Sequence, residues 1–172
     1  MQQLDRAKRY LIRIQKLYQG VFSSTGHDKD AYDDDVISFF IHCYHIRDWI
    51  IHLNESAITK KQVDEYINEH RALMICADLA NGAKHCRLTR TLRTEKQPHV
   101  YGKERHASMW LTGDGGGEVM KCTYAILSNG EDLDALEVAT ACIQLWELFV
   151  NEFTHNNSLK RSLGDASRPK AS

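Results

Sequence analysis

The segment from Asp33 to Leu53, DDDVISFFIHCYHIRDWIIHL, constrains the fold more than any other part of the chain. It opens with three acids, which favour the start of a helix because carboxylates there meet the positive end of the helix dipole. Apolar residues then recur at steps of three and four, as in a helix with one buried face. These residues are Val36, Phe39, Phe40, Cys43, Ile46, Ile50 and Leu53.

Arg47 falls within this apolar face. A guanidinium keeps its proton, so an arginine that is buried there needs a partner or a wet cavity. We therefore expect Arg47 to mark either a polar site inside a helical bundle or an interface with a second chain.

Three other segments have helical periodicity. The first runs from Leu4 to Gly20, and the third from Lys60, after a Thr59 cap, to about Asn81. Gly82 predicts a break or kink after the third helix. The fourth runs from about Asp132 to Phe153 and has a wide apolar arc. Four amphipathic helices of this kind predict a four-helix bundle.

Between the third and fourth helices the composition changes. Residues 84–106 are rich in lysine and arginine and are interpreted as a basic connector. Met109 to Leu111 and Val119 to Leu127 are expected to form two strands, joined by a turn from Gly113 to Glu118. The predicted fold is therefore mainly all-α, a four-helix bundle with a small β-hairpin inserted between the third and fourth helices. Residues 1–155 form a single bundle domain, and residues 156–172 form a flexible polar tail.

Composition excludes several classes of protein. The 172 residues carry a formal net charge of −1, so no global charge attracts nucleic acid or an anionic membrane. No apolar run approaches the roughly 20 residues that span a bilayer. The five cysteines are an odd number without a CxxC pair, which favours a reducing cytoplasm and no disulfide framework. No cofactor is expected.

Arg47, Asp48 and His52 are the first candidate catalytic group. Arginine, a polar residue, three others and then histidine resemble the signature of the HEPN superfamily of all-α bundle domains. The resemblance implies metal-independent RNA cleavage, usually in a cleft between two subunits, with Arg47 steadying the phosphate, His52 assisting proton transfer and Asp48 orienting them. In an unbroken helix residues five apart point about 140° away from each other, so a helix break or a dimer contact must bring Arg47 and His52 together.

A second group of residues predicts a substrate-binding pocket. The run from Ile75 to His85, ICADLANGAKH, resembles an asparagine-lysine-histidine segment of HEPN-like proteins. His70 and Asn81 share an apolar stripe, and His85 would join it if the helix continued, so the pocket would collect an amide and two imidazoles near Arg47. The alternative is that Asn81 caps a broken helix and His85 binds a backbone carbonyl.

The basic connector gives a third group. If it is helical, arginines 87, 90 and 93 form a ridge that would contact phosphates, and Lys84, Arg87 and Arg90 are therefore expected to bind substrate. The alternative is a solvated face that the acidic loop from Asp28 to Asp35 balances. A metal site is the weakest hypothesis, because no ligand set is complete. Its candidates are His42, Cys43, His45, His52, His85 and Cys86.

The sequence thus favours an HEPN-like cytoplasmic protein that binds RNA or cleaves it without metal, of the kind found in toxin–antitoxin and phage-defence systems. Expected partners are RNA, a second copy in a homodimer and a protein partner or antitoxin, but no membrane. The alternative is a non-catalytic interaction module of the same fold, in which the polar residues on the apolar stripes fix helix register or a dimer contact.

Overall fold

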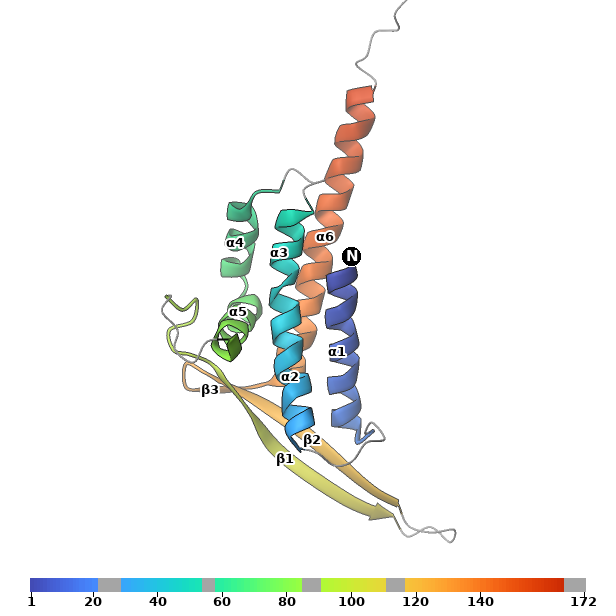
Figure 1. The fold of residues 1–172 in the computed structure, drawn as a ribbon, viewed down its shortest axis with the longest axis vertical. Helices are drawn as coiled ribbons and strands as arrows, with labels where there is room; N and C mark the ends of the chain where they lie inside the picture. The colour runs from blue at the N-terminus through green and yellow to red at the C-terminus, as the bar shows by residue number, and fades with distance from the viewer. Residues whose placement is uncertain (22–28, 54–57, 85–90, 111–116, 166–172) are drawn as a thin grey trace, which may run out of the picture.

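The protein is mainly helical, with a small three-stranded antiparallel sheet (Figure 1). The structure, a computed structural model, describes residues 1–21, 29–53, 58–84, 91–110 and 117–165. The helices in this part of the chain are α1 (Gln2–Gln19), α2 (Lys29–Tyr44), α3 (Ile46–His52), α4 (Lys60–Glu69), α5 (Arg71–Lys84) and α6 (Ala135–Asp165).

Several helix ends lie where the sequence predicts them. The first helix ends at Gly20, which adopts the left-handed conformation with φ 75°. Thr59 caps α4 through a capping box, in which its hydroxyl accepts from the backbone N–H of Gln62 and the Gln62 side chain accepts from the Thr59 N–H. The last helix begins slightly later than the predicted start near Asp132: Asp134 caps α6 by accepting from the N–H groups of Leu136 and Glu137.

The second and third predicted helices are each divided in two, which corrects the prediction of continuous helices. Between α2 and α3, His45 keeps helical backbone angles, and its carbonyl oxygen accepts hydrogen bonds from Asp48 N–H and Trp49 N–H. The helix α3 therefore continues in nearly the same direction as α2 (Figure 1). Between α4 and α5, His70 is extended, with φ −121° and ψ 110°. This is a true break in the chain direction.

The predicted break at Gly82 is wrong, because α5 continues to Lys84. The glycine has a different reason to be there. A Cβ atom at position 82 would lie 2.5 Å from Nε2 of Gln97, so the glycine leaves room for the Gln97 side chain, whose Nε2 donates to Asp78 O at 2.9 Å.

The sheet contains one more strand than predicted. The expected hairpin is present as β1 (His99–Trp110) and β2 (Gly117–Ser128), but β1 begins inside the predicted basic connector and is far longer than Met109–Leu111. The third strand, β3 (Glu131–Asp134), replaces the expected first turn of the last helix. Asn129 and Gly130, with φ 53° and 87°, form the two-residue turn between β2 and β3. The predicted turn from Gly113 to Glu118 lies largely outside the described residues.

The last helix is longer than predicted. The structure continues α6 to Asp165, so residues 156–165 extend the helix where a polar tail was expected. A helix of this length projects beyond the other helices (Figure 1). Residues 166–172 lie outside the described part of the chain.

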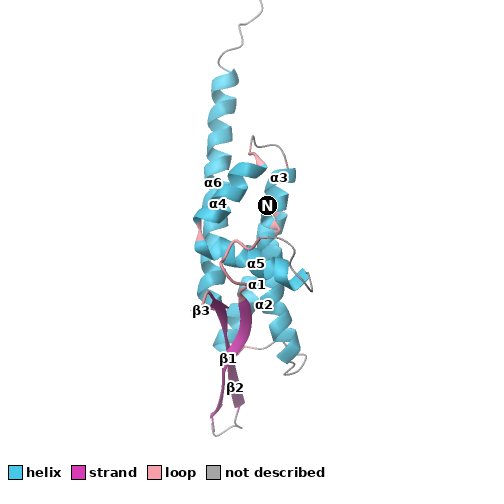
Figure 2. Ribbon diagram, turned by 90° about the vertical axis from the view of Figure 1, so that its left-hand side faces the viewer, coloured by secondary structure: helices cyan, strands magenta, loops and turns pink. Residues whose placement is uncertain are grey.

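The core lies between the helices and one face of the sheet. Its largest fully buried side chains include Trp146 of α6, Phe39 and Phe40 of α2 and Ile14 of α1. Figure 2 shows the sheet at one end of the helices. Tyr18 joins the two layers: its hydroxyl donates to Tyr124 O at 2.9 Å and accepts from Tyr124 N–H at 3.0 Å, and burial raises the pKa of Tyr18 to about 12. The hairpin is thus attached to α1 through the half-buried phenol of Tyr18.

Candidate functional site

Arg47 is mostly enclosed by the protein, as the sequence predicts, and the carboxylates of Asp48 and Asp64 bind its guanidinium. Its side chain is 14% exposed. The Nε and Nη2 atoms donate to the two oxygens of Asp64 at 2.8 and 2.9 Å, and Nη1 donates to Asp48 Oδ1 at 2.7 Å. The hydrogen bonds to Asp64 are the main reason that the pKa of Arg47 lies above its usual range. Arg47 therefore joins α3 to α4 through a bidentate ion pair.

Arg93 extends this ion pair into a network. Its guanidinium donates to Asp64 Oδ1 at 3.0 Å and to the side chain of Asn68. Its backbone N–H donates to both oxygens of Asp78, a carboxylate on α5 that is 2% exposed. Asp78 also accepts from the N–H and the hydroxyl of Thr94, each at 2.7 Å. The network ties the loop of residues 91–98 to α3, α4 and α5. Arg93 therefore does not belong to the predicted helical ridge of arginines 87, 90 and 93, because it lies in this loop.

Apart from Asp48, the predicted site residues that the structure describes form no hydrogen bond with Arg47. His52 is exposed at the end of α3. His70 Nδ1 lies 2.8 Å from Tyr66 O, and the ring packs against the Tyr66 ring with centroids 4.3 Å apart. Asn81 is half-buried within α5 rather than at a helix end. Three further candidates, His85, Arg87 and Arg90, lie outside the described residues.

Lys84 instead belongs to a different group of polar side chains, which we name the imidazole–lysine patch. It consists of Arg6 on α1, His42 on α2, His45 between α2 and α3, and Lys84 at the end of α5. Lys84 Nζ donates to His45 Nε2. Because Nε2 accepts this hydrogen bond, the His45 ring carries no proton at that nitrogen.

Gln3 connects Arg6 to His42 within the patch. This glutamine is 1% exposed. Its Nε2 donates to His42 O at 2.9 Å and lies 3.4 Å from His42 Nδ1, while its Oε1 accepts from Arg6 Nη1 at 3.2 Å. The ring of Tyr10 stacks on His42 with centroids 5.0 Å apart. The imidazole of His42 is therefore fixed from both sides.

The electrostatics of the patch keep both imidazoles neutral at neutral pH. Burial lowers the pKa of His42, and the positive charges of Arg6 and Lys84, together with the neighbouring His45 ring, lower it further. Burial and Lys84 likewise lower the pKa of His45, while Asp48 opposes this shift. Cations beside neutral imidazoles create a locally positive site in a chain whose overall charge is near zero.

Sequence reasoning missed most of this patch. His42 and His45 were noticed as an i, i+3 pair, but only as candidates for a metal. Gln3 and Arg6 are also three residues apart, so a polar face on the first helix was detectable in principle. Their meeting with His42 depends on the pairing of α1 with α2, 39 residues away for Gln3, and helical periodicity carries no information about such pairing.

The residues of the predicted metal site do not converge where the structure describes them. Cys43 points into the core with no exposed surface, whereas His52 is exposed. In the described residues, the groups that approach closely enough to share an ion are the thiols of Cys43, Cys76 and Cys142. His85 and Cys86 lie outside this part of the chain.

No family model, curated protein or solved structure matches this chain. Within the described ranges, every helix is too short or too polar to cross a membrane.

Proposed function

We propose that the chain is an HEPN-like four-helix bundle that binds RNA, with the imidazole–lysine patch as its phosphate-binding surface. One observation carries the proposal: in the described part of the chain, neither Arg6 nor Lys84 forms an ion pair with a carboxylate. Arg47 and Arg93, by contrast, are neutralised by Asp64. The cations of the patch are therefore available to an external anion.

The chemistry of the patch suits a phosphodiester. A guanidinium and an ammonium both donate to phosphate oxygens, and RNA adds 2′-hydroxyl groups that donate and accept hydrogen bonds. Neutral imidazoles have one donor and one acceptor nitrogen, which match a hydroxyl. The motif resemblance of Arg47, Asp48 and His52 to HEPN domains selects RNA among phosphate-containing ligands.

Metal-independent cleavage is a further part of the proposal, and Arg47 and His52 are the residues that the resemblance assigns to it. The bidentate bond to Asp64 keeps Arg47 from a substrate phosphate in a single chain. Cleavage by this pair would therefore require the carboxylate to be displaced, or a homodimer in which the exposed His52 of one copy approaches the other. RNA binding by the patch needs neither change.

We expect Lys84→Ala to weaken binding of a short single-stranded RNA several-fold, measured by fluorescence anisotropy in the presence of EDTA, because the substitution removes one phosphate contact. Lys61→Ala is the matched control, since Lys61 is 83% exposed on α4 and remote in sequence from the patch residues. Equal affinity of the two variants would reject the patch as the binding surface. A denaturing gel of wild-type protein incubated with the RNA in EDTA reports cleavage. If Arg47 and His52 are catalytic, Arg47→Ala and His52→Ala should each abolish this cleavage.

The second candidate is the non-catalytic interaction module. The observation that favours it is the same Arg47–Asp64 pair, because a fully paired arginine fixes helix packing without any substrate. Apolar side chains are also exposed on two neighbouring helices, Ile12 on α1 and Leu148 on α6, where a homodimer or a protein partner such as an antitoxin would bind. An RNA titration without any binding would leave this candidate in place.

A further inference from the structure

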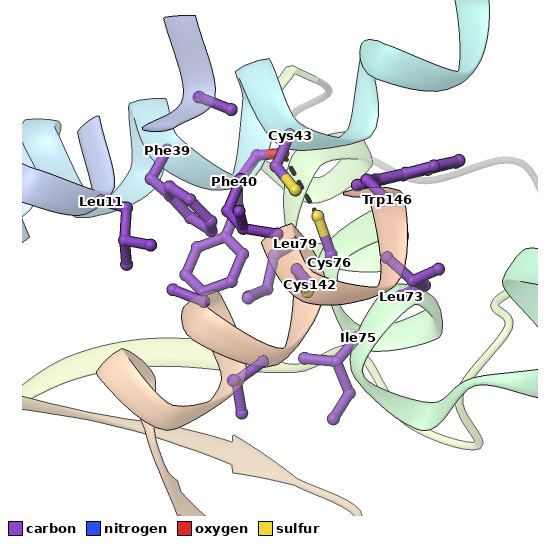
Figure 3. Packing of buried hydrophobic residues seen from close by; sticks show 14 of the residues in the cluster. Leu11, Phe39, Phe40, Cys43, Leu73, Ile75, Cys76, Leu79, Cys142 and Trp146 are labelled. Carbon is purple, nitrogen blue, oxygen red and sulfur yellow. Dashed lines mark hydrogen bonds between the residues drawn. The ribbon is translucent and has the colours of Figure 1, made fainter. Parts of the chain in front are cut away.

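Three buried thiols meet in the core, on the inner side of helices that also carry residues of the imidazole–lysine patch: Cys43 directly follows His42 on α2. Cys43 on α2, Cys76 on α5 and Cys142 on α6 are at most 1% exposed, and their sulfur atoms all lie within 4.8 Å of one another. Figure 3 shows them among Phe40, Leu79 and Trp146. Three elements far apart in the sequence each contribute one sulfur.

The sulfur spacing is close to that of a three-coordinate site. A trivalent centre such as arsenic(III) keeps a lone pair, so its three bonds to sulfur, each about 2.3 Å, form a pyramid with angles of roughly 100° and place the sulfur atoms about 3.5 Å apart. Side-chain rotations that shorten the sulfur–sulfur distances by up to about 1.3 Å would bring the thiols from their present separation of at most 4.8 Å to this one. No large backbone movement is needed, since the three sulfur atoms already lie within 4.8 Å of one another.

A second observation lies beside the thiols. The indole of Trp146 is 1% exposed, and its Nε1 has no hydrogen-bond partner among the described residues. A buried donor without a partner is costly, and a thiolate is a far better acceptor than a thiol. Burial disfavours ionisation of Cys43, but its neighbours Cys142, Cys76 and Trp146 favour the thiolate more strongly and lower the pKa of this thiol. Burial raises the pKa of both other thiols.

Charge balance decides which ion fits. The core around the thiols is apolar, so a complex that retains a net charge there is disfavoured. Three thiolates around a monovalent ion keep a charge of two minus, and around a divalent ion a charge of one minus. A trivalent thiophilic centre leaves none.

We propose that Cys43, Cys76 and Cys142 form a three-coordinate thiolate site for a soft trivalent centre, of which arsenite is the prototype. Arsenous acid would react with the three thiols to form three arsenic–sulfur bonds, and its three hydroxyl groups would leave as three waters with the thiol protons. No atom changes oxidation state, so no reductant or oxidant is required. The site is independent of RNA binding, but it would lock α2 to α5, the two helices that carry His42 and Lys84.

The test uses the full chain with Cys86→Ser and Cys122→Ala, so that only the three core thiols remain. After reduction and addition of arsenite, native mass spectrometry should show one arsenic gained and three hydrogens lost per chain. Thiol titration during unfolding in urea should show all three cysteines protected when arsenite is present and reactive when it is absent, because burial alone protects them only in the folded protein. The melting temperature should rise by about 5–10 °C at a hundredfold excess over the dissociation constant.

Each of Cys43→Ala, Cys76→Ala and Cys142→Ala, made in the same background and checked for native circular dichroism, should abolish the three-bond adduct. An adduct that forms equally well in any of these variants would overturn the proposal. So would the absence of an adduct in the parent protein, which needs no cluster variant and therefore does not depend on their folding. Restoring Cys122 to the parent should change nothing, because it lies on β2 and outside the cluster.

Discussion

Asp78→Ala is expected to lower the free energy of unfolding by about 3 kcal/mol, because three donors lose a charged acceptor inside the protein. These donors are the N–H groups of Arg93 and Thr94 and the hydroxyl of Thr94. The backbone donors cannot move away, and Asp78 is only 2% exposed, so water does not replace the carboxylate easily. Urea unfolding followed by circular dichroism measures the loss, and the melting temperature should fall by roughly 10 °C.

Asp34→Ala is the control for this substitution. Asp34 is an exposed acid on α2, so its removal should change stability by no more than about 0.5 kcal/mol. Equal effects of the two substitutions would mean that the loop of residues 91–98 is not held by Asp78. The loop would then not position Arg93 against Asp64 either.

Asp64→Ala should destabilise the protein by about 2–3 kcal/mol, more than Arg47→Met does. The carboxylate serves two guanidinium groups, those of Arg47 and Arg93, which are 14% and 20% exposed. Its removal leaves two largely buried cations short of a partner, whereas Arg47→Met removes a charge and leaves Asp64 paired with Arg93. The loss is smaller than for a fully buried pair because Asp64 is 25% exposed. Chemical denaturation of both variants gives the comparison, and the opposite order would contradict the proposed network.

Acid should remove the difference in stability between wild type and Asp64→Ala. The hydrogen bond from Arg47 is the largest cause that lowers the pKa of Asp64 below its ordinary value of 3.8. The unfolded chain therefore binds a proton at a higher pH than the folded chain does, so the stabilisation is complete above about pH 4 and declines as the pH falls below 3.8. The stability difference between wild type and Asp64→Ala should shrink in this range, and a difference that grows on acidification would exclude the ion pair as its source.

The parts of the fold that follow from local periodicity were predictable. The stripe from Leu4 and the arc from Leu136 both indicated helices, and Gly20 and Thr59 were identified as helix boundaries. The break at His70 was not predictable, because its extended backbone is set by how α4 and α5 pack rather than by the local residue types. β1 was missed for another reason, since its lysine, arginine and histidine residues conceal the alternation of a strand.

The site was predictable to a smaller extent. A charged residue within an apolar stripe is easy to identify in a sequence. The position of Arg47 therefore suffices to predict that its side chain is largely enclosed. Its partner Asp64 lies 17 residues further along the chain, on a separate helix. The sequence contains several other acids, and nothing in it identifies Asp64 as the one that pairs with Arg47. The imidazole–lysine patch needs α1, α2 and α5 to meet, and the cysteine cluster needs α2, α5 and α6. Both therefore depend on tertiary packing.

The salt dependence of RNA affinity tests most directly whether the patch binds phosphates. Each phosphate contact on a single strand contributes about −0.7 to the slope of log K against log salt concentration. Arg6→Ala with Lys84→Ala should therefore make the slope shallower by about 1.4 relative to wild type, while Lys61→Ala leaves it unchanged. A double variant that keeps the wild-type slope, or a wild-type affinity that does not depend on salt, would contradict RNA binding by the imidazole–lysine patch.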